Sequence, residues 1–305
     1  MFDDPLFKVL GPMRLTAVVD IGANPIDGDP PYKDLLQKRG CRVTGFEPQP
    51  EALEILNQRK GDLETYLPNV IGDGKPATLR ICRAPGMTSL YTPDAKMLKH
   101  FYGFSEWGTV VKEISVSTTR LDDLIAEDGL DFLKIDVQGS ELTAIENGQR
   151  CLARAVAIQA EVSFLPLYEQ QPTFAEIDQA LRKLGFIPHM FAAINQRMIA
   201  PLFDERNPYA ALNQLLEADA VYVRNFTRPE AMTDEQLKHL AIIAHHCYRS
   251  FDLATNCIFH LCKRHVIAPD SVQNYLALPR SMSALGQKRT RAVQNGLSAL
   301  PPRAT

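Results

Sequence analysis

Residues 16–24, with the sequence TAVVDIGAN, form a short apolar run that ends in an aspartate and a glycine. Such a run predicts a strand that is buried on both faces of a sheet and leads into a turn. Strands buried in this way are typical of parallel sheets that helices cover on both faces. The run therefore indicates an α/β protein, with Asp20 and Gly22 at the start of a loop that faces a ligand.

Strand and helix patterns alternate from this run onward. Further strands are predicted at residues 41–48, 65–71, 78–83, 113–118, 132–137 and 155–162. Helical spacing of apolar residues predicts helices at residues 32–39, 51–60, 121–127, 141–148 and 174–184. Two late strand patterns follow at residues 185–191 and 218–224, one of them expected to be an added antiparallel edge strand. The order predicts a doubly wound, mostly parallel sheet with helices on both faces.

The chain is expected to divide into four parts. Residues 1–15 form an N-terminal arm, and residues 16–226 form the sheet domain. Residues 227–270 carry two helical patterns with no strand between them, which predicts a small helical appendage. Residues 271–305 lack the apolar density that repays ordering, so a disordered tail is expected there.

Composition restricts the class of protein. The chain has 305 residues, a formal net charge of −3 and a pI near 6.2, so it lacks the excess of positive charge that binds nucleic acid or anionic lipid. No apolar stretch approaches the roughly 20 residues that cross a bilayer, and the chain does not open on a basic and then apolar segment. The six cysteines form no CxxC pair. We therefore expect a soluble, cytoplasmic protein with no nucleic-acid partner and no membrane span.

Cysteines and histidines near the C-terminal end raise the question of zinc. His245, His246, Cys257, His260 and Cys262 carry the side chains that zinc prefers. They fall in predicted helices among apolar residues, where Cys and His commonly pack in a core. The spacing also matches no zinc motif, so we predict no metal site.

Two carboxylates follow neighbouring strands of the predicted sheet, and ligands bind beyond the carboxyl ends of such strands. The loop after Asp20 lacks the Gly-x-Gly-x-x-Gly pattern that holds a pyrophosphate, and its acidic start suits a cationic or zwitterionic ligand. Glu47 ends the next strand, where a carboxylate can accept hydrogen bonds from both hydroxyls of a ribose. Turn chemistry at Asp20 and helix capping by Glu47 are the alternatives.

Two later strands also end in acids. The segment 133–141, LKIDVQGSE, places Lys134 and Asp136 in an apolar strand, and the cost of burying charge puts them near its solvated end. Asp136 would orient an acceptor or serve as a base, and Glu161 is a second candidate for a substrate-binding or base residue. The alternatives are an ion pair between Lys134 and Asp136, and a Glu161 that only anchors the loop after its strand.

From about Ala17 to Asn225 the sequence resembles the FkbM family of methyltransferases. The blocks that carry the resemblance follow in the family's order: Asp20–Asn24, Phe46–Pro48, Thr119–Asp123, Lys134–Glu141 and Glu161–Val162. The resemblance implies a Rossmann-like fold of the class I methyltransferase type and S-adenosylmethionine as cofactor. It also implies O-methylation of a hydroxyl group on a sugar, a glycan, a polyketide or a related small molecule.

The same resemblance implies roles for individual residues. Asp20, Gly22 and Asn24 would line the methionine part of the cofactor, Glu47 the ribose, Asp73 the adenine, and Asp136 the space near the transferred methyl group. Two features depart from the family. Residues 25–27 replace a glycine-containing turn, and Gln138 stands where many members have glutamate, which leaves Asp136 or Glu161 as the base.

Two other functions remain as alternatives at this point. A non-catalytic nucleoside-binding protein of the same fold would explain Gln138, and a nicotinamide-dependent oxidoreductase is disfavoured by the missing glycines. The aromatic segment 101–107 is expected on a long loop, either as part of an acceptor pocket or as a packing loop. The sequence does not identify the methyl acceptor or the oligomeric state, and a homo-oligomer is one of the states it allows.

Overall fold

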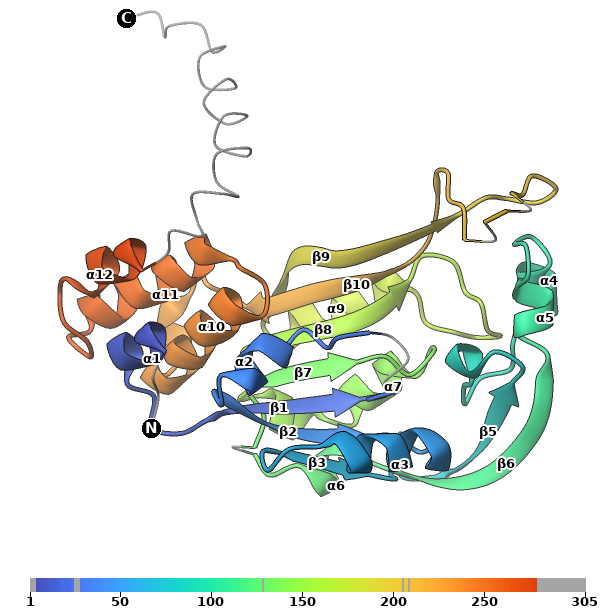
Figure 1. Cartoon of the computed structure of the whole chain (residues 1–305), viewed down its shortest axis with the longest axis horizontal. Coiled ribbons are helices and arrows are strands. Elements are labelled where there is room, and N and C mark those ends of the chain that lie inside the picture. Colours follow the sequence, from blue (N-terminus) through green and yellow to red (C-terminus); the bar gives the residue numbers. More distant parts are fainter. Residues whose placement is uncertain (1–3, 25–27, 128, 205, 208, 279–305) are drawn as a thin grey trace, which may run out of the picture.

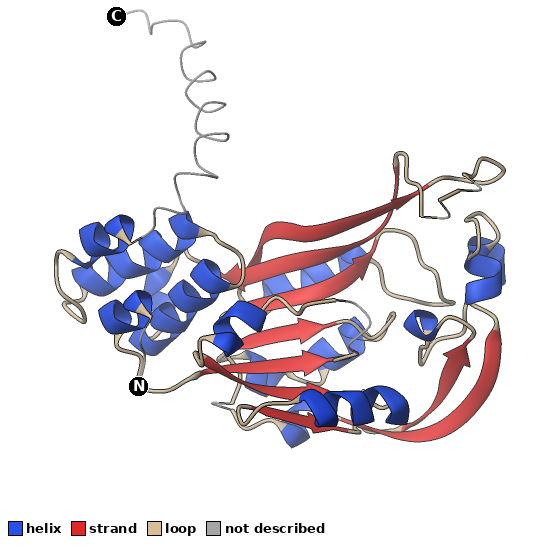
Figure 2. Cartoon of the chain, viewed as in Figure 1, coloured by secondary structure: helices blue, strands red, loops and turns tan. Residues whose placement is uncertain are grey.

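A seven-stranded sheet runs through the centre of the molecule (Figures 1 and 2). The computed structural model describes residues 4–24, 28–127, 129–204, 206–207 and 209–278. The sheet has the order β3-β2-β1-β7-β8-β10-β9. Its strands are β1 (Thr16–Ile21), β2 (Cys41–Phe46), β3 (Glu64–Leu67), β7 (Phe132–Ile135), β8 (Ala157–Ser163), β9 (Phe186–Arg197) and β10 (Gln214–Arg224). Only β10 runs antiparallel to its neighbours β8 and β9, so the predicted doubly wound, mostly parallel sheet is confirmed.

β1 lies in the middle of this sheet and sets the position of the site. All six of its residues are buried, as its apolar sequence predicts. Asp20 lies opposite Gly45 of β2 and opposite Lys134 of β7. The chain order reverses between β1 and β7, and in open parallel sheets ligands bind at this switch point, beyond the carboxyl ends of the strands.

Helices cover both faces of the sheet (Figure 1). On one face, a buried core joins alternate strand residues such as Val19 and Leu133 to four helices. These are α6 (Leu121–Leu124), α7 (Glu141–Glu146), α8 (Gln149–Leu152) and α9 (Phe174–Lys183). On the other face, strand residues such as Val18 and Phe132 share a core with α2 (Lys33–Gln37) and the C-terminal helices. The helix α3 (Pro50–Arg59) leads into β3 along the same side as α2 (Figure 1).

A second, three-stranded sheet extends beyond the carboxyl ends of the main strands (Figure 2). It has the order β4-β6-β5, with β4 (Val70–Ile71), β5 (Pro76–Cys82) and β6 (Val110–Thr119). The single strand predicted at residues 65–71 is thus two strands, in two different sheets. The segment 101–107, predicted as a loop, contains the short helix α5 (Phe104–Trp107), which follows α4 (Ala95–Leu98). Phe101 and Phe104 pack with Leu167 and Tyr168 of the loop after β8, which fixes this second sheet over the strand ends.

β9 and β10 form a long hairpin at the edge of the main sheet. Both are longer than their sequence patterns predicted, because antiparallel pairing between them continues out to Gln214 and Arg197. The outer end of the hairpin reaches the segment that contains α4 and α5 (Figure 1). There the rings of Tyr102 and Phe203 stack, with their centroids 4.8 Å apart. The predicted antiparallel strand is present as β10, but it lies one position in from the edge, and β9 is the edge strand. The hairpin bounds one side of the space beyond the strand ends.

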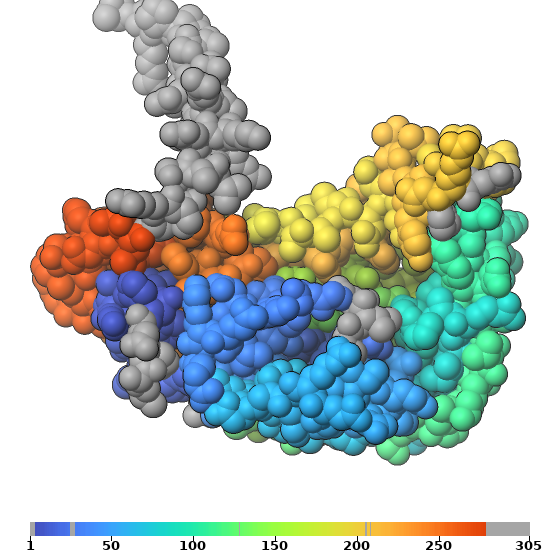
Figure 3. All heavy atoms as spheres, viewed as in Figure 1, coloured from blue at the N-terminus to red at the C-terminus, as the bar shows by residue number. Residues whose placement is uncertain are grey.

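The C-terminal helices gather at the opposite end, near the amino ends of the strands (Figures 1 and 3). They are α10 (Asp234–His246), α11 (Phe251–Lys263) and α12 (Ser271–Ala277), and the N-terminal helix α1 (Pro5–Leu10) packs with them. The predicted arm thus contributes a helix to this unit. α12 lies in the segment where disorder was expected, and Tyr275 in it is fully buried, so order extends beyond residue 270. Residues 279–305 lie outside the described residues. None of the described helices is long and apolar enough to span a membrane.

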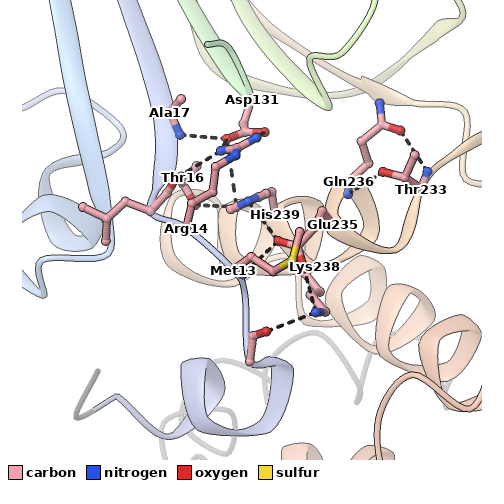
Figure 4. A network of polar contacts seen from close by, with 12 residues as sticks. Met13, Arg14, Thr16, Ala17, Asp131, Thr233, Glu235, Gln236, Lys238 and His239 are labelled. Atoms are coloured by element: carbon pink, nitrogen blue, oxygen red, sulfur yellow. Dashed lines mark hydrogen bonds and ion pairs between the residues drawn. The ribbon is translucent and has the colours of Figure 1, made fainter. Parts of the chain in front are cut away.

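A polar network joins the arm and α10 to the sheet (Figure 4). Arg14 makes a bidentate ion pair with the buried Asp131, at 2.5 and 2.9 Å, and the carboxylate also accepts a bond from the backbone N–H of Ala17. Thr16 Oγ1 lies 3.0 Å from Nδ1 of His239, which is fully buried in α10. The helical unit is therefore held by polar contacts as well as by its apolar core.

Candidate functional site

A cavity opens at the carboxyl ends of β1, β2 and β7, on the side of the second sheet. Its apolar wall comes from strand ends and the segments after them: Ile21, Phe46, Pro48, Ile71, Leu79 and Val137. Its polar wall includes Asn24, Glu47, Asp136 and Gln138. A largely apolar pocket with a few converging polar groups is the usual form of a small-molecule site.

Gly22 brings two segments of backbone together beside this cavity. Its φ is +77°, and a Cβ atom built there would overlap the carbonyl oxygen of Asp136. Its N–H donates to the carbonyl oxygen of Phe46 at 3.0 Å, while the N–H of Asp136 donates to the carbonyl oxygen of Ile21 at 3.0 Å. Gly22 therefore allows the loop after β1 to pack against the end of β7.

Glu47 lines the same cavity from the end of β2, although it is only 2% exposed. Its Oε1 accepts a hydrogen bond from the backbone N–H of Gln49 at 2.8 Å. The position is fixed because the N–H of Glu47 donates to the carbonyl oxygen of Leu67 in β3 at 3.0 Å. The structure thus places a buried carboxylate against an apolar cavity, where ligand hydroxyls can reach it.

Asp20 lies at the end of β1, as predicted, but it faces a different space. Its Oδ2 accepts a hydrogen bond from the hydroxyl of Tyr32 at 2.5 Å, and Lys134 Nζ lies 3.4 Å from its Oδ1. Lys134 Nζ also donates to the carbonyl oxygen of Gly22 at 3.1 Å. Burial and the neighbouring Asp20 charge raise the pKa of Tyr32 well above its ordinary value. Asp20 therefore anchors α2 and the loop after β1, and it does not line the cavity that contains Glu47.

Asp73 also lies apart from this cavity. Its carboxylate accepts bonds from the backbone N–H and from Nζ of Lys75, at 3.0 and 2.8 Å. The hydrogen bonds from Lys75 lower the pKa of Asp73. At this end of the cavity the wall is formed by Asn69, Val70 and Ile71 instead.

A polar groove adjoins the cavity and shares Asn24 and Asp136 with it. The groove crosses the face of the sheet beside α2, and Lys134, Gln159 and Asp219 line it from β7, β8 and β10. We call this space the polar groove. Asp136 thus borders two neighbouring spaces, one mainly apolar and one polar.

Asp136 belongs to a cluster of carboxylates at the ends of β7 and β8. Single oxygen atoms of Asp136, Glu141 and Glu161 all lie within 4.8 Å of one another. Gln138 Nε2 donates to Asp136 Oδ1 at 3.0 Å and to Glu161 Oε2 at 2.8 Å, so an amide bridges two of the three acids. Glu141 Oε1 accepts bonds from the N–H groups of Val137 and Gly139. The structure therefore brings the predicted pair of Asp136 and Glu161 together.

Burial raises the pKa values of the acids around Asp136. The pKa of Glu141 rises to about 7, because burial and the nearby Asp136 charge outweigh its backbone hydrogen bonds. Burial and the charge of Asp136 raise the pKa of Glu161 well above its ordinary value. Acids this close cannot all be ionised at neutral pH, so the cluster keeps at least one proton.

Three residues of the site escaped sequence reasoning. Ser89 donates from its hydroxyl to the carbonyl oxygen of Gln138 at 2.6 Å, and the Tyr168 hydroxyl lies 3.2 Å from Gln138 Oε1. Ser140 lines the cavity, is 2% exposed, and has no hydrogen-bond partner for its hydroxyl within the described part of the chain. No local sequence pattern assigns any of the three a role in the site.

Solved structures to which the chain shows a low similarity include two methyltransferases. Magnesium protoporphyrin IX methyltransferase from Synechocystis PCC 6803, with bound SAM, is 12% identical with a TM-score of 0.35. The similarity covers 70% of this chain and 73% of that one. Precorrin-6y C5,15-methyltransferase from Geobacter metallireducens GS-15 is also 12% identical, with a TM-score of 0.33 over 72% of this chain and 85% of that one.

A characterised relative and a family model match the sequence itself. The 2-O-methyltransferase NoeI of Sinorhizobium fredii (strain NBRC 101917 / NGR234) is 28% identical over an alignment of 174 residues, and the match covers 50% of this chain. The match spans 66% of that relative, slightly less than two thirds of its length. The model of the methyltransferase FkbM domain matches residues 20–188, more than half of the chain and the part that builds both the cavity and the carboxylate cluster. The chain therefore belongs to the FkbM family of S-adenosylmethionine-dependent methyltransferases.

Proposed function

We propose that this chain transfers the methyl group of S-adenosylmethionine to a hydroxyl oxygen of a sugar, a glycan, a polyketide or a related small molecule. The observation that carries the proposal is the position of Asp136, which borders both the cavity and the polar groove. A carboxylate between a cofactor space and an acceptor space is where O-methylation needs a base. The printed activity of the relative NoeI, 2-O-methylation, supports a hydroxyl acceptor.

The residues of the cavity fit the cofactor. The apolar wall around Phe46 and Ile71 suits an adenine ring, and the buried Glu47 carboxylate suits the two hydroxyls of the ribose. Asn24 and the backbone at Gly22 would lie along the methionine part. When bound, the cofactor supplies a methyl group on a positively charged sulfur, and the Asp136 carboxylate suits that charge.

The polar groove suits an acceptor that carries several hydroxyl groups. Its lining offers both acceptors and donors, from Asp219, Gln159 and Lys134. Within this arrangement Asp136 would orient the acceptor hydroxyl and take its proton, and Glu161 would be the second group of the pair. Most of the acceleration comes from holding the two reactants in line, so a weak base suffices.

Labelled S-adenosylmethionine tests the proposed acceptor class. The chain is incubated with extracted glycans, lipids and small metabolites, and the labelled products are identified. We expect an O-methyl ether of a hydroxylated compound. Label found only on nitrogen or carbon would exclude the proposed chemistry.

The substitution Asp136→Asn tests the base. We expect it to reduce turnover by at least about 100-fold, since the amide cannot accept the proton. Binding of S-adenosylhomocysteine should change little, because the product carries no positive charge on sulfur. Turnover that stays within a few-fold of wild type would remove Asp136 from the proposed role.

A further inference from the structure

Gln138 lies at the centre of the carboxylate cluster in a backbone conformation that few side chains adopt. Its φ is +53°. For a residue other than glycine this conformation is unfavourable and persists only where the surroundings hold it. Here Ser89 Oγ donates to its carbonyl oxygen at 2.6 Å, and Tyr168 Oη lies 3.2 Å from its side-chain oxygen. Two segments distant in sequence therefore hold the residue in place.

The amide of Gln138 directs its donors at the two acids beside the cavity. A side-chain amide has two N–H groups, and here Nε2 lies 2.8 Å from Glu161 and 3.0 Å from Asp136. Hydrogen bonds to an ionised carboxylate favour the charged form and are stronger than bonds between neutral groups. The amide thus offsets part of the repulsion between the two acids. Glutamate at this position would add negative charge and supply neither donor.

We infer that Gln138 is a positioning residue, whose amide holds Asp136 and Glu161 as one pair. The same hydrogen bonds stabilise negative charge on that pair, which faces the sulfonium of the cofactor. The inference rests on the proposed function, which places the sulfonium beside Asp136. A glutamine suits this position because its amide donates to each of the two acids, whereas a glutamate would add a negative charge beside them.

The charged and titratable groups that face this pair come from several elements. Glu141 of α7, Tyr168 of the loop after β8, and Glu217 and Asp219 of β10 interact with the pair directly. Arg197 of β9 acts on Glu217, and Lys134 of β7 acts on Asp219. Burial and the neighbouring negative charges raise the pKa of Glu161. Removing the two donors makes ionisation of the pair less favourable, so its negative charge should form only at higher pH.

The preference of the protein for S-adenosylmethionine over S-adenosylhomocysteine measures this charge without an acceptor. The two ligands differ at sulfur, which is positive in the first and neutral in the second. Calorimetric affinities for both are compared from about pH 5.5 to about pH 8.5 in wild type, Gln138→Leu and Gln138→Glu. The control is Gln171→Leu, which removes a buried amide that donates to Ser163 instead of to a carboxylate.

In Gln138→Leu we expect the preference for S-adenosylmethionine to fall roughly tenfold at neutral pH and to recover at higher pH, because a neighbouring charge typically changes such an equilibrium by that factor or more. The preference is a ratio of two affinities, so a change at the cavity wall that weakens both ligands equally cancels, and measurable binding of S-adenosylhomocysteine shows that the variant is folded. In Gln138→Glu the pH at which half of the preference for S-adenosylmethionine is present should also move to a higher value. An unchanged preference at every pH in both variants, or the same loss in Gln171→Leu, would overturn the inference while leaving O-methylation intact.

Discussion

At the scale of single residues, close backbone packing explains a glycine beside the cavity. Gly22 allows the loop after β1 to lie against the end of β7, where any Cβ atom would overlap the carbonyl oxygen of Asp136. The contact involves backbone on one side, so a rotamer change cannot relieve it. Its positive φ of 77° adds the usual cost for a residue with a side chain.

We predict that Gly22→Ala lowers the free energy of unfolding by at least about 2 kcal/mol, since it combines overlap with an unfavourable φ. Gly11→Ala is the matched control, because Gly11 also has a positive φ, of 52°, and no described atom lies within 4 Å of the added Cβ. Denaturant unfolding of both variants gives the comparison. Equal losses in the two variants would show that backbone overlap plays no part.

The sequence was sufficient to predict some residues of the site and not others, for physical reasons. Glu47 and Asp136 end parallel strands, so the edge they share follows from the fold. Asp20 also ends a strand, but tertiary contacts with Tyr32 and Lys134 direct it elsewhere. The role of Gln138 could not be predicted, because its contacts with Ser89 and Tyr168 span 49 and 30 positions in the sequence.

At the scale of elements, Arg224 ties the end of β10 to two helices. Its guanidinium donates to the carbonyl oxygens of Leu152 and Ala153 after α8, of Leu184 after α9, and of Ala155, at 2.5 to 2.7 Å. The last carbonyl groups of a helix have no partner within the helix, so such bonds satisfy them. Burial lowers the pKa of Arg224 to about 10, which still leaves the side chain charged at neutral pH.

We predict that Arg224→Met destabilises the chain by roughly 2 to 4 kcal/mol, because several buried carbonyl groups lose their donor at once. The melting temperature of the purified variant measures the loss. Arg182→Met serves as the control, since Arg182 is exposed and pairs only within α9. A loss of less than about 0.5 kcal/mol in both variants would show that water satisfies those carbonyl groups equally well.

The order of the elements followed from hydrophobic periodicity, whereas their ends depended on tertiary contacts. The strand predicted at residues 65–71 breaks at Pro68 and Asn69, and the pairing partners of β3 and β4 belong to two different sheets. The long hairpin was underestimated because its outer half is largely exposed, and only pairing between the strands defines it.

At the scale of the whole molecule, the buried His239 makes the contact between the helical unit and the sheet sensitive to acid. His239 is fully buried next to Thr16, and Asp131, Arg14, Glu235 and Lys238 surround it (Figure 4). Burial lowers the pKa of His239, since the charged ring is poorly solvated there. The unfolded chain therefore binds a proton at this residue at a higher pH than the folded protein does.

We predict that stability is fully present above about pH 6.5 and falls as the pH drops below that value, where an unfolded histidine gains its proton. His239→Asn should reduce this slope by up to about 1.4 kcal/mol per pH unit. Denaturant unfolding from about pH 7.5 to about pH 5 measures both slopes. Identical slopes in the two proteins would assign the acid sensitivity to other groups.

The central claim is that the cavity containing Glu47 is the cofactor site, and calorimetric titration of S-adenosylmethionine into wild type and Glu47→Ala tests it most directly. We expect the variant to bind roughly tenfold to a hundredfold more weakly, because it loses the buried carboxylate that accepts hydrogen bonds from the ribose hydroxyls. Its melting temperature without ligand should remain close to that of wild type. Equal affinity in the two proteins would mean that the cofactor does not bind in the cavity that contains Glu47.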